Sequence, residues 1–281
     1  MNSLFQTSFM QSIKNLFAID KNDSHTFLMK SALWIAMLSV LFERYETFIG
    51  YVMSGEYFIS TTIGLMGVAL LLFFHSKLHR TALVLFAICL LILSAEGWPS
   101  QANHSWLAVW IIAPTAILSQ WWSYSHYQRY VRVTMGIVMI AAGMQKLVTH
   151  TYFDGSYITY LSNYGSISEQ MFGFLCTPST ESCLWHAGIG SFLVVWQFVV
   201  GLLLITGQAG LMVLVIEISF LLGAGVFANE MNFQVLAISS LMIGFGYGMA
   251  RWLAVVCVCF LIIDVISIGN IALMFIDLLN L

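Results

Sequence analysis

Charged side chains inside apolar stretches are the residues whose type and spacing could do chemistry in this sequence. Glu43, Arg44 and Glu46 stand close together in one apolar run, Glu96 ends another, and Lys146 ends a third. A charge is costly inside a membrane span, so each is a candidate functional residue. A lysine withdrawn from water serves as a base or binds an anion. We therefore expect Lys146 to act as a catalytic base in an outward-opening cavity, tuned by Glu43, Glu46 or Glu96.

Further polar residues are predicted to bind a ligand near this cavity or at the membrane midplane. They are Arg44, His150, Asp154, His186 and Glu217. The alternative is structural: Arg44 pairs with a glutamate to fix helix packing, and Lys146 extends its ammonium group to the outer interface.

The cysteines divide into an outer-loop pair and cysteines within apolar runs. Cys176 and Cys183 stand seven residues apart in CTPSTESC. In an oxidising compartment this pair is predicted to form a disulfide, the alternative being two reduced thiols. Cys89, Cys257 and Cys259 are interpreted as small apolar filler. We expect no metal or haem centre, because no span interior carries a histidine.

The amino-acid composition limits the class of protein that positions these residues. The chain has 281 residues, 60% hydrophobic and 8% charged, whereas a soluble domain carries about 25% charged residues. A soluble enzyme, a disordered chain and a disulfide-stapled mini-protein are excluded. The net charge of −3, without blocks of like charge, gives no indication of a nucleic-acid partner.

Apolar runs near the roughly 20 residues needed to cross a bilayer recur along the chain. They predict an all-α, polytopic transmembrane helical bundle of nine spans, or eight if 57–95 is partly re-entrant. The predicted spans are 28–52, 57–74, 81–95, 106–122, 130–147, 187–206, 210–228, 231–248 and 252–276.

Residues 1–26 are predicted to form an amphipathic helix lying in the membrane interface, ahead of a transmembrane domain at 27–281. The apolar residues recur at helical spacing and the segment lacks the basic start and unbroken apolar stretch of a signal peptide. Those apolar residues are Leu4, Phe5, Phe9, Ile13, Leu16 and Phe17.

Positive charges predict the orientation of the bundle. The loops 96–105, 148–186 and 229–230 contain no Lys or Arg, whereas the segments on the opposite side carry most of them. By the positive-inside rule the N-terminus is cytoplasmic and the 148–186 loop faces outward.

Residues 132–161, RVTMGIVMIAAGMQKLVTHTYFDGSYITYL, resemble the horizontally transferred transmembrane (HTTM) family, which includes vitamin K-dependent γ-glutamyl carboxylase. The shared elements are a small-residue helix ending in Lys146, then Phe153, Asp154 and Gly155. Residues 185–207 are similar to the family's next helix, where Gln197 replaces a frequent glutamate and is predicted to contact ligand. The same pattern occurs in DoxX and MauE-like membrane proteins. In the carboxylase the corresponding lysine is implicated as the base that handles vitamin K hydroquinone.

Three functions follow as hypotheses. The first is a membrane subunit that supports or matures a membrane or periplasmic protein partner at the outer face of a bacterial inner membrane. The second is an enzyme acting on a quinone, or another small lipophilic molecule, with Lys146 as base. The third is a transporter using Glu217 and Asp264, although no inverted repeat is evident. Membrane lipid surrounds the chain in all three.

Overall fold

The computed structural model describes residues 24–75, 77–97, 103–118, 124–164, 175–176, 183–228 and 231–245. Every long regular element in these ranges is an α-helix, which confirms the all-α prediction. The predicted interfacial helix at 1–26 and the predicted span 252–276 lie outside the described residues, apart from 24–26.

Helices occupy the other eight predicted spans, with two helices over the first of them. The segment 148–186, predicted to be a long outer loop, contains an additional helix, α8, which the sequence pattern did not predict. The helices are α2 (Ser24–Glu43), α3 (Tyr45–Ser54), α4 (Tyr57–Leu72), α5 (His79–Glu96), α6 (Asn103–Leu118), α7 (Tyr124–Thr149), α8 (Ser156–Tyr164), α10 (Leu184–Thr206), α11 (Leu211–Ala228) and α12 (Met231–Phe245).

Three of these helices are long and apolar enough to cross a membrane: His79–Glu96, Ser125–Thr149 and Leu184–Thr206. Shorter apolar helices lie at Tyr57–Leu72, Ser105–Ile117, Leu211–Gly225 and Phe233–Phe245. Both the long and the shorter helices expose many large apolar side chains, as expected where lipid rather than water is the solvent. Length and composition thus indicate a membrane protein.

The chain divides into two compact units. The predicted division into an interfacial helix at 1–26 and a transmembrane domain at 27–281 stays a prediction. Unit 1 comprises Met1–Arg129 and Met242–Leu281, and unit 2 comprises Tyr130–Leu241. The division falls within α7 and within α12, so each of these helices contributes to both units.

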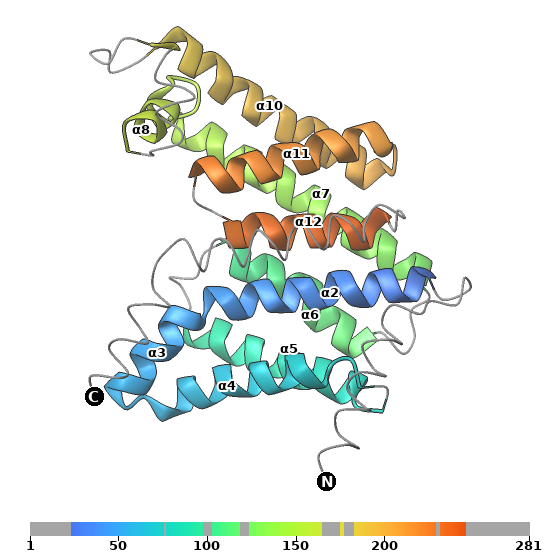
Figure 1. Cartoon of the computed structure of the whole chain (residues 1–281). Coiled ribbons are helices and arrows are strands. Elements are labelled where there is room, and N and C mark those ends of the chain that lie inside the picture. Colours follow the sequence, from blue (N-terminus) through green and yellow to red (C-terminus); the bar gives the residue numbers. More distant parts are fainter. Residues whose placement is uncertain are drawn as a thin grey trace, which may run out of the picture. The chain divides into compact units, whose positions relative to one another are not determined.

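In unit 1, α4 packs against α5 and α5 against α6, while α2 contacts both α4 and α6 (Figure 1). The Trp34 indole N–H donates a hydrogen bond to the Leu70 carbonyl at 3.2 Å and thereby joins α2 to α4. The Thr115 hydroxyl donates its proton to the Ile111 carbonyl at 2.6 Å and accepts a hydrogen bond of 2.6 Å from the Tyr127 hydroxyl, which joins α6 to the first turn of α7. Polar groups therefore fix the pairing of helices whose faces are otherwise apolar.

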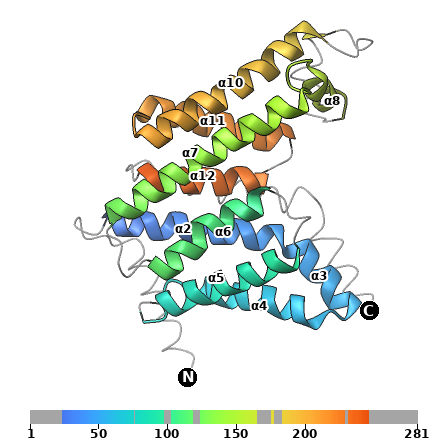
Figure 2. The ribbon, with the colours of Figure 1, turned by 180° about the vertical axis from the view of Figure 1, so that it is seen from behind.

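Unit 2 is built on a close crossing of α7 and α10. A Cβ atom on Gly136 would lie 2.7 Å from the Gly201 carbonyl oxygen, and one on Gly201 would lie 2.8 Å from the Gly136 carbonyl oxygen. Small residues at these two positions let the backbones approach closely, as in many membrane helix pairs. The short helix α8 lies against α10, as the views from both sides show (Figures 1 and 2).

Candidate functional site

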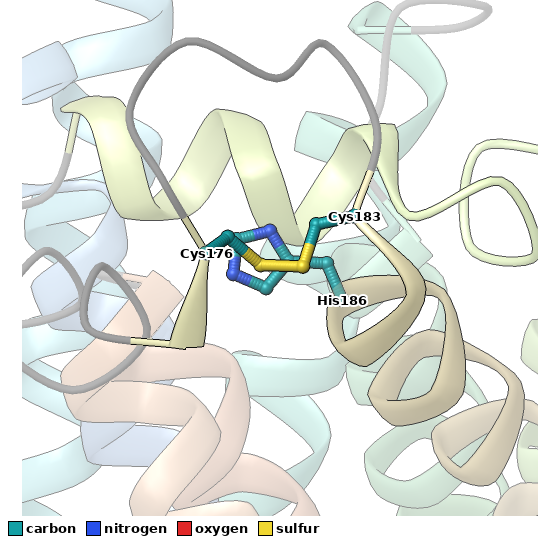
Figure 3. A group of neighbouring side chains, drawn as sticks. All are labelled: Cys176, Cys183 and His186. Atoms are coloured by element: carbon teal, nitrogen blue, oxygen red, sulfur yellow. A yellow bond between two sulfur atoms is a disulfide. The ribbon is translucent and has the colours of Figure 1, made fainter.

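The segment between α7 and α10 of unit 2 contains a disulfide that lies beside side chains of α8 and α10. Cys176 and Cys183 form a disulfide with their Cα atoms 6.1 Å apart, which confirms the predicted pairing. The imidazole of His186, in the first turn of α10, lies beside this disulfide (Figure 3). His186 is only 2% exposed, and its Nδ1 lies 2.9 Å from the Thr159 hydroxyl oxygen on α8. We call residues 150–164, 175–176 and 183–190 the outer segment, after the outward orientation that the sequence predicts for this loop.

Two glycines allow the outer segment to pack at backbone distance. Gly155 has φ +80°, and a Cβ atom there would lie 2.6 Å from the Ala187 backbone nitrogen. A Cβ atom on Gly190 would overlap the Tyr152 carbonyl group. A left-handed φ and the lack of room both require glycine at position 155. The turn before α8 is therefore held directly against the backbone of α10.

His150 and Asp154 shape the turn that leads from α7 into α8. His150 has φ +58°, the left-handed conformation common just after a helix, and its carbonyl accepts N–H bonds from Phe153 and Asp154 at 2.9 and 3.2 Å. The Asp154 carboxylate accepts the Ser156 N–H at 2.8 Å, at the start of α8. Both predicted ligand-binding residues are exposed and have structural roles here.

Asp154 gives the outer segment a pH dependence. The Ser156 backbone N–H, then the Ser156 hydroxyl and the charge of His150, hold the pKa of Asp154 below its ordinary value of 3.8. The stabilisation is therefore complete above pH 3.8 and is lost as the pH falls through the lower, folded-state pKa. We expect Asp154→Asn to remove this small acid-dependent component. Thermal midpoints of both proteins between neutral pH and pH 2 check this, and identical pH profiles would contradict it.

Lys146 lies half-buried in the last turn of α7, beside the same turn. Its Nζ is 5.2 Å from the centre of the Tyr152 ring, a cation–π distance. The Tyr152 ring in turn stacks on Tyr157, with centroids 4.4 Å apart. Tyr152 was not anticipated from the sequence, because a loop residue six positions after a helical lysine carries no periodic signal.

Glu43 and Arg44 form a separate cluster in unit 1. The Ser105 hydroxyl at the start of α6 accepts a bond from Arg44 Nη2 at 3.1 Å and donates one to Glu43 Oε1 at 3.3 Å. Arg44 lies between α2 and α3, with φ −87° and ψ −3°, so the predicted first span is divided at this residue. This cluster fits the alternative of structural packing, with a serine as the intermediary.

Removing the Ser105 hydroxyl is expected to cost about 1–3 kcal/mol of unfolding free energy, since both charged groups then lose a buried partner. Ser105→Ala tests this. Ser54→Ala is the matched control, because that exposed hydroxyl bonds only to the Tyr51 carbonyl of its own helix among the described residues. Equal unfolding free energies for the two variants, measured in bicelles, would show that the bridge does not stabilise unit 1.

Glu217 lies in the interior of α11 and is 1% exposed. The Trp196 indole N–H on α10 donates a bond to Glu217 Oε2 at 2.7 Å. Glu217 Oε1 and Gln197 Oε1 are buried and have no hydrogen-bond partner within the described part of the chain. Trp196 was missed from the sequence, because nothing in it specifies which helix faces Glu217.

Of the other two predicted catalytic residues, Glu96 and Glu46, the structure describes the side chain of Glu96 only. Glu96 ends α5 and is exposed, while Glu46 lies in α3 and its side chain lies outside what the structure describes. Lys146 belongs to unit 2, whereas Glu43, Glu46 and Glu96 belong to unit 1. Convergence of these four residues on one cavity therefore remains a prediction.

Three helices of membrane-spanning length and apolarity, in a chain with 8% charged residues, define the class as a helical membrane protein. Comparison with known family models, curated proteins and solved structures finds no match. The resemblance of residues 132–161 and 185–207 to the HTTM family therefore remains a prediction.

Proposed function

We propose that this protein is an integral membrane subunit, of HTTM- or DoxX-like type, that holds or matures a partner protein at the outer face of a bacterial inner membrane. The observation that carries the proposal is the construction of the outer segment. A disulfide, a histidine–threonine bond and two backbone contacts at glycines hold it in one shape. A pre-organised surface loses less conformational entropy when a partner binds.

Exposed apolar side chains lie on this rigid segment. Leu184 is 88% exposed and Trp185 is 67% exposed in the first turn of α10, and Tyr160 on α8 is also exposed. Tryptophan and tyrosine are enriched at protein interfaces and at the membrane boundary, where one end of the ring is apolar and the other polar. The partner that fits is a protein with an apolar patch at the outer membrane boundary.

Site-specific photo-cross-linking in native membranes tests this proposal. A photoreactive phenylalanine derivative at Trp185 or Tyr160 is expected to capture the same protein in high yield. Leu71 on α4 is the control, because it is 81% exposed on a helix outside the outer segment. Lipid adducts alone at Trp185 and Tyr160, or equal protein capture at Leu71, would contradict a docking role.

The second candidate function is an enzyme acting on a quinone or another lipophilic molecule, with Lys146 as base. The observation that favours it is the half-buried Lys146 ammonium beside the Tyr152 ring. Under this hypothesis Lys146→Met abolishes turnover while leaving the fold intact. Under the subunit proposal Lys146→Met loses the cation–π contact with Tyr152, which is worth about 0.5–1 kcal/mol, and partner capture continues.

A further inference from the structure

Three side chains with metal-binding atoms meet in the outer segment. The two sulfur atoms of Cys176 and Cys183 and a ring nitrogen of His186 all lie within 4.8 Å of one another (Figure 3). Zinc bonds of about 2.3 Å to sulfur and 2.0–2.1 Å to nitrogen, in tetrahedral geometry, place ligand atoms about 3.5–3.8 Å apart. The separations between the three atoms are therefore close to those expected around one zinc ion, except that the two sulfur atoms are bonded to each other.

The hydrogen bonds around Thr159 determine which nitrogen of His186 would bind. Thr159 has one hydroxyl proton, and the hydroxyl donates it to the Gly155 carbonyl oxygen at 2.9 Å. The contact of 2.9 Å between Thr159 Oγ1 and His186 Nδ1 must then run the other way, with Nδ1–H donating to the hydroxyl oxygen. In the neutral ring this leaves Nε2 as the nitrogen with a lone pair. A second group that holds one ring nitrogen while the other binds metal is the usual arrangement around zinc.

We propose that Cys176, Cys183 and His186 form a redox-gated zinc site, closed as a disulfide and opened by reduction. A dithiol reductant transfers two electrons and two protons to the disulfide, breaking the S–S bond and becoming a disulfide itself. The two thiols then release two protons as their thiolates bind Zn²⁺ with His186 Nε2. Three protein ligands leave a fourth position for water or another ligand. The site uses the same disulfide that holds the outer segment in shape, but its test below involves no partner protein, so either proposal can fail without the other.

Cobalt titration of the full-length chain in detergent micelles tests the site, since thiolate–cobalt bonds give an intense charge-transfer absorption. The chain carries the substitutions Cys89→Ser, Cys257→Ser and Cys259→Ser, so that Cys176 and Cys183 are the remaining cysteines. After phosphine reduction we expect one Co²⁺ per chain with this absorption, displaced by Zn²⁺. The same preparation left oxidised is expected to show none.

Two further variants assign the ligands. His186→Gln is expected to change the cobalt spectrum and weaken binding, because one of three ligands is lost. Thr159→Val removes the hydroxyl that orients the ring and is expected to weaken binding about 10–100-fold while preserving the thiolate absorption. Thr134→Val is the matched control, because Thr134 lies within α7 and outside the outer segment, and it is expected to bind as the parent does.

The proposal is overturned if the reduced chain shows no thiolate–cobalt absorption, or if the oxidised chain binds cobalt equally well. It is also overturned if His186→Gln leaves affinity and spectrum unchanged. The comparison of the oxidised with the reduced state uses one and the same polypeptide. It therefore tests the zinc site even if His186→Gln or Thr159→Val fails to fold.

Discussion

Gly190→Ala is expected to lower the free energy of unfolding of unit 2 by about 3 kcal/mol, the upper end of what overpacking usually costs. The added methyl would overlap the Tyr152 carbonyl group, and the obstacle is backbone rather than the end of a flexible side chain. Relief requires the turn before α8 to move away from α10. The bond between Thr159 and His186 would then be lost as well, because it joins the same two helices.

Gly188 provides a matched control two residues earlier in α10. A Cβ atom there meets nothing within 4 Å, so Gly188→Ala is expected to be neutral or slightly stabilising. Steric trapping in bicelles, with tags at exposed positions of α8 and α10, measures both unfolding free energies. If the two alanine variants are equally stable, the turn before α8 does not approach α10 at backbone distance.

Trp196→Phe is expected to cost about 1.5–3 kcal/mol, because it removes the hydrogen bond from the indole to the buried Glu217 carboxyl group. Inside the membrane no water can replace the indole as hydrogen-bond donor to the Glu217 carboxyl oxygen. A buried polar group without a partner carries its full desolvation cost. The Trp196–Glu217 bond is therefore a polar link between α10 and α11 whose loss is costly.

A double-mutant cycle separates this hydrogen bond from the lost ring volume. In a Glu217→Leu background no carboxyl group remains, so Trp196→Phe should cost less than about 1 kcal/mol. The same loss in both backgrounds would show that ring packing, and not the hydrogen bond, accounts for the effect.

The helices were predictable from sequence because each is marked by a long apolar run. All described helices except α8 fall on predicted spans, and the disulfide follows from two cysteines in a loop expected to face an oxidising compartment. The division of the first span at Arg44 was not predicted. The apolar character of a stretch depends on its own composition alone. It gives no information about Ser105 on another helix, which bonds both Glu43 and Arg44.

The contacts of the candidate site were far less predictable. Sequence reasoning placed Glu217 inside a helix and His186 at an outer end, but it could not name Trp196 or Thr159 as their partners. Those partners depend on which helix faces which, and apolar faces of similar composition do not encode that choice. The importance of Gly190 was hidden for the same reason, since Gly188 looks equivalent in the sequence and has open space around it.

We propose that the outer segment holds a partner protein rather than assembling a catalytic site around Lys146. Native mass spectrometry of the full-length chain, released gently from its own membranes, tests this most directly. We predict a stoichiometric complex with one polypeptide partner, no quinone-sized adduct, and the same complex in Lys146→Met. A chain without a partner that carries a quinone-sized adduct, lost in Lys146→Met, would contradict the claim and support base chemistry at Lys146.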